Sequence, residues 1–328
     1  MFGECGGRVI ALQRLNEESK GEISMLDPRG LYEIVASAPP TEGAVLLYDF
    51  NGFMDAGSAG EGMTRHLLSE YEHEVLVRFD IDQLLNYRTR RPQMTFSADR
   101  WSDYEAPELV IYQLHDDNGV EFLLLTGTEP DLQWERFVAA VIGLIEQWGV
   151  KLSIGYQGIP MGTPHTRPLG VTGHATSTEL LQHFDSTISH LQVPGHVAAL
   201  LELRLGQQGH DAMGYAVHVP HYLSQTNHPS SSVRLLEAVA SAANLTFTDE
   251  ALRDTARDVD AEVDAQVQDS DEVASVVEAL ERQYDMFTQE LENKNLLAES
   301  LQDLPSADEL GAELEHFLSQ QRPGSSES

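Results

Sequence analysis

Two kinds of hydrophobic pattern divide the chain. From Leu31 to Phe247, short runs of consecutive apolar residues alternate with longer stretches in which apolar residues recur every three or four positions. Continuous apolar runs are typical of strands buried on both faces, and the periodic stretches are typical of amphipathic helices. This alternation predicts an α/β fold with three α/β/α layers and a mostly parallel, mixed sheet.

The individual elements follow from the same pattern. The expected strands cover residues 31–35, 44–50, 75–79, 152–156 and 215–219. The expected helices cover residues 56–71, 131–148, 197–205 and 231–243. Residues 109–112 and 122–125 are apolar runs on either side of the turn sequence Asp116-Asp117-Asn118-Gly119, so we expect them to form an antiparallel hairpin.

The last quarter of the chain has a different composition. From Asp249 to Ser328 there are 22 acidic and 5 basic residues, so this segment carries about half of the net charge of −33. Apolar residues recur at helical spacing from Leu252 to Val267 and from Val273 to Phe287. We expect Thr248 to cap the first of these helices, and Ser306 begins a capping box for a further one.

These patterns predict three parts of the chain. They are an N-terminal extension at residues 1–28 that could be disordered, an α/β/α domain at 29–247, and an acidic helical subdomain and tail at 248–328.

The charge of −33 argues against two classes of partner. Nucleic-acid binding needs clustered cations that neutralise phosphates, and adhesion to anionic lipid needs them as well. No apolar run approaches the length of a membrane span, and Met1 to Asp27 lack the apolar core of a secretory signal, so we expect a cytoplasmic protein. Cys5 is the only cysteine, which excludes an intrachain disulfide and a cysteine-based metal site.

Three long windows contain no Asp or Glu, although the chain is very acidic. They are Gln83 to Ala98, Lys151 to Thr178 and Ala212 to Leu236. If they lie together, they form a neutral-to-positive patch that attracts an anionic ligand or an acidic peptide. Burial of the strands explains part of this pattern. It does not explain the arginines between Arg88 and Arg91, because arginine is rarely buried without a partner.

The segment from Asn51 to Gly57 follows the first core strand and opens a helix. Its glycines allow a close approach to the backbone, and a helix start can hold an anion. The segment is neither a GxGxxG nor a Walker sequence, so nucleotide binding has little support. Asp55 therefore has two interpretations, as a residue that contacts a ligand or, more simply, as the cap of the helix.

Two further segments hold candidate functional residues. In the proline-rich loop from Pro164 to Pro168, His165 could act as an acid, a base or a hydrogen-bond donor, and Arg167 could clamp an anion. The alternative is a rigid loop that an arginine–carboxylate pair anchors at a subunit interface. Glu129 could be a functional carboxylate opposite the arginines or a member of a structural ion pair.

Metal and nucleophile chemistry have little support. His221 and its neighbouring histidines lack the His-Glu-x-x-His arrangement, so structural hydrogen bonds are the simpler role for them. No Gly-x-Ser-x-Gly elbow is present. We therefore expect no metal and no cofactor.

Taken together, five short segments resemble those of the proteasome-assembly-chaperone-like (PAC-like) family, and are most similar to its uncharacterised bacterial branch. The segments are Phe50–Gly57, Arg90–Pro92, Gly127–Pro130, Pro164–Pro168 and Val219–Tyr222. The resemblance covers about residues 31–247. It implies a three-layer α/β/α fold similar to the phosphorylase/peptidyl-hydrolase type, and homo-oligomers, with a trimer as the first expectation. Eukaryotic relatives are assembly chaperones of the proteasome core particle, and archaeal relatives bind proteasome-related proteins.

Two main hypotheses of function remain, beside a weaker third one in which the acidic tail is the working part and mimics a polyanion. The first is a non-enzymatic, oligomeric, assembly-chaperone-like module that binds a protein partner, proteasome-related by family resemblance. The second is an enzyme of phosphorylase/hydrolase-like fold that acts on an anionic small molecule. The residues expected to bind a ligand or partner are Asn51, Asp55, Arg88, Arg91, Glu129, His165, Arg167 and His221. Glu129 and His165 are the candidates for proton transfer in the second hypothesis.

Overall fold

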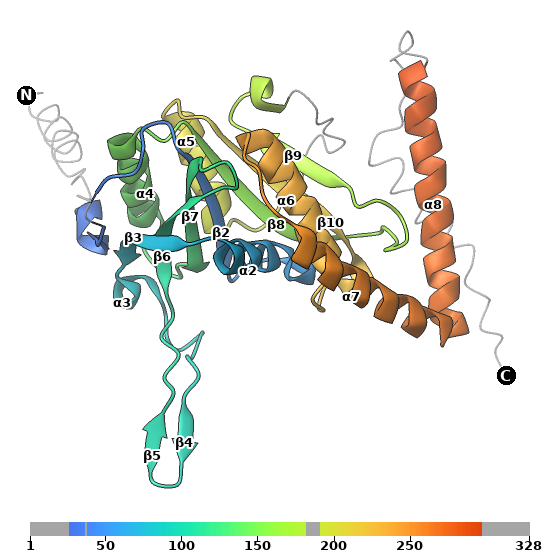
Figure 1. Cartoon of the computed structure of the whole chain (residues 1–328), viewed down its shortest axis with the longest axis horizontal. Coiled ribbons are helices and arrows are strands. Elements are labelled where there is room, and N and C mark those ends of the chain that lie inside the picture. Colours follow the sequence, from blue (N-terminus) through green and yellow to red (C-terminus); the bar gives the residue numbers. More distant parts are fainter. Residues whose placement is uncertain (1–25, 37, 182–190, 297–328) are drawn as a thin grey trace, which may run out of the picture.

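The computed structural model describes residues 26–36, 38–181 and 191–296. Cys5, most of the expected N-terminal extension and the capping box at Ser306 lie outside these ranges. At the centre is an eight-stranded mixed sheet (Figure 1). Its strands, in order across the sheet, are β1 (Tyr32–Ile34), β3 (His73–Phe79), β6 (Leu109–His115), β7 (Glu121–Thr128), β2 (Val45–Asn51), β8 (Leu152–Met161), β10 (Ala212–Pro220) and β9 (Val171–Ala175).

The four strands in the middle of the sheet, β7, β2, β8 and β10, are parallel to one another. Tyr48 on β2 lies opposite Leu125 on β7 and Gly155 on β8, which fixes the register. Strand β6 pairs antiparallel with β7, so the expected hairpin is confirmed. The edge strands β1 and β9 are also antiparallel to their neighbours. The expected α/β fold with a mixed, mostly parallel sheet is therefore confirmed.

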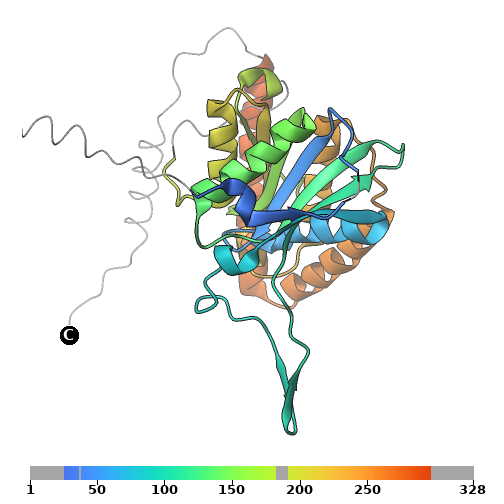
Figure 2. The same cartoon turned by 90° about the vertical axis from the view of Figure 1, so that its left-hand side faces the viewer.

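Helices cover both faces of the sheet (Figures 1 and 2). On one face, α4 (Trp134–Trp148) and α5 (Val197–Gln207) pack on alternate strand residues such as Leu46 and Leu125. On the other face, α2 (Ala59–Glu70) and α6 (Pro229–Ala243) pack on Leu47 and Leu124. Successive strand residues point to opposite faces, so both sets are buried and the strands appear as continuous apolar runs.

Two acidic helices follow the α/β layers. Helix α7 (Glu250–Gln268) packs on α6 and buries Leu252 and Ala256. Helix α8 (Asp271–Leu296) packs on α7 and runs alongside the body (Figure 1). The cap expected at Thr248 is wrong, because the helix begins at Glu250 and the Thr248 hydroxyl donates to Asp117 instead.

A small hairpin projects far from the body, as Figures 1 and 2 show. It consists of β4 (Thr95–Ser97) and β5 (Arg100–Ser102), which form a separate two-stranded sheet. It lies on the long connection between α3 (Ile81–Leu84) and β6. The apolar periodicity of the sequence did not predict it, because strands of three residues are too short to show one. Among the helices of the described ranges, none has the length and apolar character needed to span a membrane.

Candidate functional site

The topology gathers most of the candidate residues at one edge of the sheet. The parallel strands β7, β2, β8 and β10 end at Thr128, Asn51, Met161 and Pro220, respectively. Glu129, Asp55, His165 and His221 come shortly after these strand ends. Ligands of open α/β sheets usually bind beyond the carboxyl ends of the strands, so this carboxyl edge is the candidate site.

The turn from Asn51 to Gly57 is the centre of the carboxyl edge. The Asp55 carboxylate accepts hydrogen bonds from the backbone amides of Gly60 (2.9 Å), Glu61 (3.0 Å) and Gly158 (2.8 Å). Two of these amides open α2, and the third belongs to β8. Ser58 occupies the N-cap position of α2, but the Asp55 carboxylate satisfies amides of the first turn, as a cap does, and it also ties the turn to the neighbouring strand.

Burial raises the pKa of the Asp55 carboxyl, while its hydrogen bonds from the Glu61, Gly60 and Gly158 amides act in the opposite direction. The carboxylate is therefore a structural group inside the edge, held by three backbone donors. Asn51, by contrast, is exposed at the end of β2.

Arg90 joins this turn to Glu129. Its guanidinium Nη1 donates to the carbonyl oxygens of Glu129 (3.0 Å) and Asn51 (3.3 Å). Its Nη2 lies 3.4 Å from Asp131 and 3.8 Å from Glu129. The buried Glu129 carboxylate also accepts the amide of Val197 (2.9 Å), at the start of α5. Glu129 therefore does lie opposite an arginine, in an ion pair that holds α5 and the edge together.

The arginine that reaches the edge is not one of the two expected to bind a ligand. Arg88 and Arg91 are exposed on the connection toward the hairpin, while Arg90 between them is partly buried. The segment is a turn, in which the amides of Thr89 and Arg90 donate to the Asn86 carbonyl, and this turn directs Arg90 inward while Arg88 and Arg91 remain exposed. The sequence shows the cluster of three arginines, but it does not show which of them faces inward.

Contacts with the Asn51–Gly57 turn connect all three acid-free windows. The first window reaches the turn through Arg90, and the second through the Gly158 amide. The third contributes Ser224, whose carbonyl accepts the Gly57 amide (2.9 Å), and His228, whose amide donates to the Gly57 carbonyl (2.8 Å). Gly57 has a φ of 67°, which favours glycine. The three windows therefore meet around one turn.

His165 has all of its ring nitrogens engaged. Its backbone amide donates to the Tyr222 hydroxyl (2.9 Å), and that hydroxyl lies 2.7 Å from the ring Nδ1. Its Nε2 lies 3.0 Å from Asp264 on α7. The bonds are all satisfied if Tyr222 donates to Nδ1 and Nε2–H donates to Asp264. Burial raises the pKa of Tyr222, so its hydroxyl keeps its proton. The network fixes the loop and leaves no tyrosinate for nucleophilic attack.

Arg167 connects the same loop to α8. Its Nε and Nη2 donate to the two carboxylate oxygens of Asp285 at 2.8 Å each, and Nη1 donates to Glu281 at 3.2 Å. The hydrogen bonds from Arg167 lower the pKa of Asp285. Tyr284 adds a hydrogen bond from its hydroxyl to the Pro168 carbonyl (3.1 Å). Acidic residues of the last quarter thus supply the carboxylates that anchor the proline-rich loop, within one chain.

Removal of the two hydrogen bonds from Arg167 to Asp285 is expected to loosen α8. In Arg167→Ala, α8 loses its bidentate contact with the body, so its backbone amides should exchange about tenfold faster, because local opening no longer breaks a charged pair. Hydrogen–deuterium exchange by mass spectrometry measures this. Arg282→Ala is the control, since the one ion pair of Arg282 among the described residues is with Glu278 on α8 itself. If the amides of α8 exchange at the same rate in both variants, the Arg167–Asp285 pair does not hold the helix.

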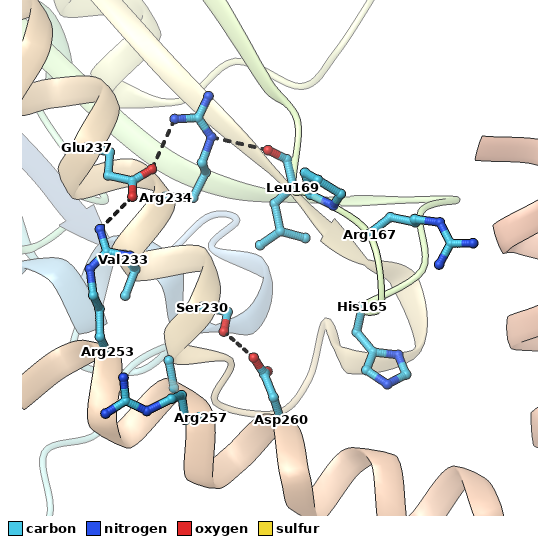
Figure 3. A pocket seen from close by; sticks show the side chains of 12 residues that line it. His165, Arg167, Leu169, Ser230, Val233, Arg234, Glu237, Arg253, Arg257 and Asp260 are labelled. Carbon is cyan, nitrogen blue, oxygen red and sulfur yellow. Dashed lines mark hydrogen bonds and ion pairs between the residues drawn. The ribbon is translucent and has the colours of Figure 1, made fainter. Parts of the chain in front are cut away.

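Next to the loop is a pocket of about 650 Å³ between the loop, α6 and α7 (Figure 3). Four arginines line it, together with His165, two acids and several apolar side chains. The arginines are Arg167, Arg234, Arg253 and Arg257, and the acids are Glu237 and Asp260. The sequence interpretation missed Arg253 and Arg257 because they lie in the acidic segment. Their spacing of four residues on a helix was the signal that they share a face.

A buried carboxyl group lies beneath the central turn. Asp49 on β2 is 4% exposed, and its carboxylate lies 3.4 Å from the Thr64 hydroxyl, which in turn lies 2.7 Å from Tyr156 Oη. Burial, and next the negative charge of Asp55, raise the pKa of Asp49 well above its ordinary value. The folded protein therefore keeps this group protonated at a pH where the unfolded chain would ionise it.

Substitution of Asp49 by asparagine should stabilise the protein as the pH rises. With a raised pKa, the folded state binds the proton more tightly than the unfolded state, so wild-type stability falls above the unfolded carboxyl pKa of about 4. Asparagine is neutral at every pH and lacks this loss. Urea unfolding of Asp49→Asn and wild type at about pH 4 and pH 7 tests it. The exposed Asp269→Asn is the control, and its stability difference from the wild type should be the same at both pH values. The same pH-independent difference for Asp49→Asn would contradict the prediction.

In the part of the chain that the structure describes, no group of three or more His, Cys, Asp or Glu side chains is arranged to hold a metal ion. His221 is exposed, and its carbonyl accepts the Ser224 hydroxyl (2.8 Å). Its ring contacts Tyr222 edge-on, with 5.4 Å between centroids.

Comparison with known proteins decides the family. The model of the PAC2 family matches residues 50–267, which is more than half of the chain. The chain belongs to the PAC2 family. The matched region includes the carboxyl edge and extends through α7, so the pocket arginines of α6 and α7 lie within the family domain. The resemblance seen in the five sequence segments is therefore confirmed.

Two solved structures of proteins with unknown function are similar to this chain over most of its length. A Mycobacterium tuberculosis protein of unknown function, Rv2714, is 46% identical, with a TM-score of 0.76 over 79% of this chain and 92% of its own. A Corynebacterium glutamicum protein of unknown function is 35% identical, with a TM-score of 0.74 over 78% of this chain and 97% of its own.

A more distant neighbour has a name that refers to a function. The Mycobacterium tuberculosis proteasome-assembly chaperone homologue Rv2125 is 23% identical, with a TM-score of 0.66 over 71% of this chain and 99% of its own, which shows a shared fold. No curated protein matches the sequence.

Proposed function

We propose that this PAC2-family protein is a non-enzymatic, oligomeric, assembly-chaperone-like module that holds a protein partner in the cytoplasm. The PAC2 family, and a neighbour named as a proteasome-assembly chaperone homologue, support a partner related to the proteasome. The charge of −33 disfavours nucleic acid and membrane as partners. The acidic unit from residue 248 onward serves in this proposal as a subdomain that braces the proline-rich loop.

The single observation that carries the proposal is the projecting hairpin. Phe96 is 57% exposed and Trp101 is 65% exposed, with ring centroids 4.9 Å apart, and the hairpin extends away from the rest of the chain (Figure 2). Large aromatic side chains dominate the energy of protein–protein interfaces, and a solvated pair on an extended arm is costly without a partner. We assign the arm to self-association, and the expected state is the trimer that the family resemblance implies.

The carboxyl edge is assigned to the partner. Asn51 and His221 are exposed there, and Arg88 and Arg91 are exposed on the adjoining connection toward the hairpin, next to Arg90. Asp55, Glu129, His165 and Arg167 are engaged in contacts that fix the backbone of the edge. The first four would contact the partner, and the second four would hold the surface in shape. Exposed arginines in an acidic protein favour an acidic segment of the partner.

Purified components test this assignment. Proteasome core-particle subunits from the same organism are presented to the immobilised protein, and binding is measured by biolayer interferometry. The proposal predicts binding by the wild type and weaker binding by Arg88→Glu/Arg91→Glu, whose side chains face solvent. Arg65→Glu is the matched control, because Arg65 is exposed on α2 and, in the part of the chain that the structure describes, its ion pair is with Glu61. Equal binding by both variants would remove the edge from the proposal.

The pocket favours a second candidate, an enzyme that acts on an anionic small molecule. Its size suits such a ligand, and His165 borders it. His165, however, has Tyr222 and Asp264 as partners, and Glu129 is bound to Arg90 and Val197. The two residues expected to transfer protons are therefore committed to separate structural networks, which favours binding over catalysis.

A further inference from the structure

Two arginines in the pocket share one carboxylate. Glu237 on α6 accepts Arg253 Nη2 at 2.6 Å and lies 3.3 Å from Arg234 Nη1, as Figure 3 shows. Within the described residues, Arg234 Nη2 and Arg253 Nη1 have no hydrogen-bond acceptor. Arg253 also donates from Nε to Asp249 (2.7 Å), so two carboxylates balance the two arginines, but each arginine still has N–H donors to spare.

Arg257 adds a third guanidinium. It lies one helical turn after Arg253 on α7, and both line the same pocket. It is 72% exposed and pairs with Asp254 through Nη2, so its Nε and Nη1 have no acceptor among the residues that the structure describes. Planar guanidinium groups bind carboxylates and phosphates through paired N–H bonds. The mouth of the pocket can therefore bind an anion.

The inner wall of the same pocket is apolar. Val233 and Ala256 are buried, and Leu169 and Pro168 complete the wall next to Arg234, which donates to the Leu169 carbonyl (3.2 Å). An inorganic anion would leave this wall unused. A volume of about 650 Å³ holds an anionic group together with an aliphatic chain of several carbon atoms.

We propose that this pocket binds an aliphatic carboxylate, with Arg234, Arg253 and Arg257 on the carboxylate and the apolar wall on the chain. Two sources present this chemistry, namely the carboxyl terminus of a peptide that ends in an aliphatic residue and a free aliphatic acid. The proposal does not depend on the hairpin or on the proteasome as partner. The overall negative charge repels anions at long range, so recognition operates through these short contacts.

The test uses a fluorescein-labelled hexapeptide of glycine and serine that ends in leucine, in salt of about 150 mM, where the Debye length is about 8 Å. Fluorescence anisotropy should show binding of the free acid, and the C-terminal amide should bind at least about tenfold more weakly. Equal affinities for acid and amide, or no binding of the acid at about 1 mM protein, would overturn the proposal.

Competitors identify the source. If N-acetyl-leucine displaces the hexapeptide, the pocket takes free aliphatic acids; if only unlabelled hexapeptide displaces it, the pocket takes peptide termini. Both results support an aliphatic carboxylate. Displacement by inorganic phosphate at the same concentration as N-acetyl-leucine would overturn the role of the apolar wall.

Variants link binding to the arginines. Arg253→Gln and Arg257→Gln should each weaken binding of the free acid about tenfold, because each removes charged donors. The Arg257 side chain is 72% exposed and that of Arg253 is 44% exposed, so neither belongs to the core and the fold should tolerate the changes. Arg65→Gln on α2 and Phe96→Ser/Trp101→Ser on the hairpin should bind like the wild type. Unchanged binding by the first two variants would place the hexapeptide elsewhere and overturn the proposal.

Discussion

A protein with Phe96→Ser and Trp101→Ser is expected to be a monomer at concentrations where the wild type is an oligomer. Each aromatic side chain buries 150–250 Å² when an interface covers it, and each such anchor contributes about 2 kcal/mol. Their combined loss should weaken self-association roughly a thousandfold. The hairpin sheet is separate from the eight-stranded sheet, so the fold of the body should not change.

Light scattering after size-exclusion chromatography measures this directly. The wild type should have a mass near three times the 36.3 kDa of one chain, and the variant should have the mass of one chain. Leu203→Ser/Val120→Ser is the matched control, because these two apolar residues are also about half exposed but lie outside the hairpin. A monomeric wild type, or a variant with the wild-type mass, would refute the role of the arm.

The second large effect is expected at the centre of the carboxyl edge. In Gly158→Ala, the added Cβ would overlap the carbonyl oxygen of Ala56 and come within 3.1 Å of the Ala59 Cβ. Both neighbours belong to η2 (Ala56–Ser58) and the start of α2, which Asp55 ties to the Gly158 amide. Because backbone cannot move aside as a flexible side chain can, the variant should lose about 3 kcal/mol of stability.

Urea unfolding measures this loss, and Gly143→Ala supplies the control. Gly143 lies in the interior of α4, where an added Cβ meets nothing within 4 Å, so alanine there should stabilise the helix by up to about 1 kcal/mol. The two substitutions are chemically identical, and only the surroundings differ. If Gly158→Ala is as stable as the wild type, the turn is not locked against β8, and the description of the edge as a rigid surface is wrong.

The layers of the fold could be read from the sequence because both faces of the strands are buried. Runs such as Val45 to Tyr48 are apolar at every position, and they alternate with helices of 3.6-residue period. The hairpin at residues 95–102 could not be read in this way, since its strands are three residues long and its aromatic residues face solvent. The pairing of β4 with β5 and the contact between Phe96 and Trp101 stabilise the hairpin, and a search for apolar periodicity does not detect such contacts.

The location of the candidate site could be predicted, but the ion pairs and hydrogen bonds within it could not. The ends of parallel strands share one edge, so Asn51, Glu129 and His221 were expected together. Which arginine faces inward depends on the side-chain direction along one irregular segment, and Arg90 was the one that does. Arg167 and Arg234 of the pocket lie in the acid-free windows, whereas Arg253 and Arg257 could not be found by searching for such windows, because each pairs with an acid three or four residues before it in the sequence.

The central claim is that the carboxyl edge is the surface that holds a partner. Hydrogen–deuterium exchange of the protein alone and with proteasome core-particle subunits tests it most directly. The account predicts protection at residues 51–57, 86–92 and 221–227, around the strand ends where the three acid-free windows meet. Protection confined to residues 41–44, 118–121 and 149–152, at the opposite edge of the sheet, would contradict it.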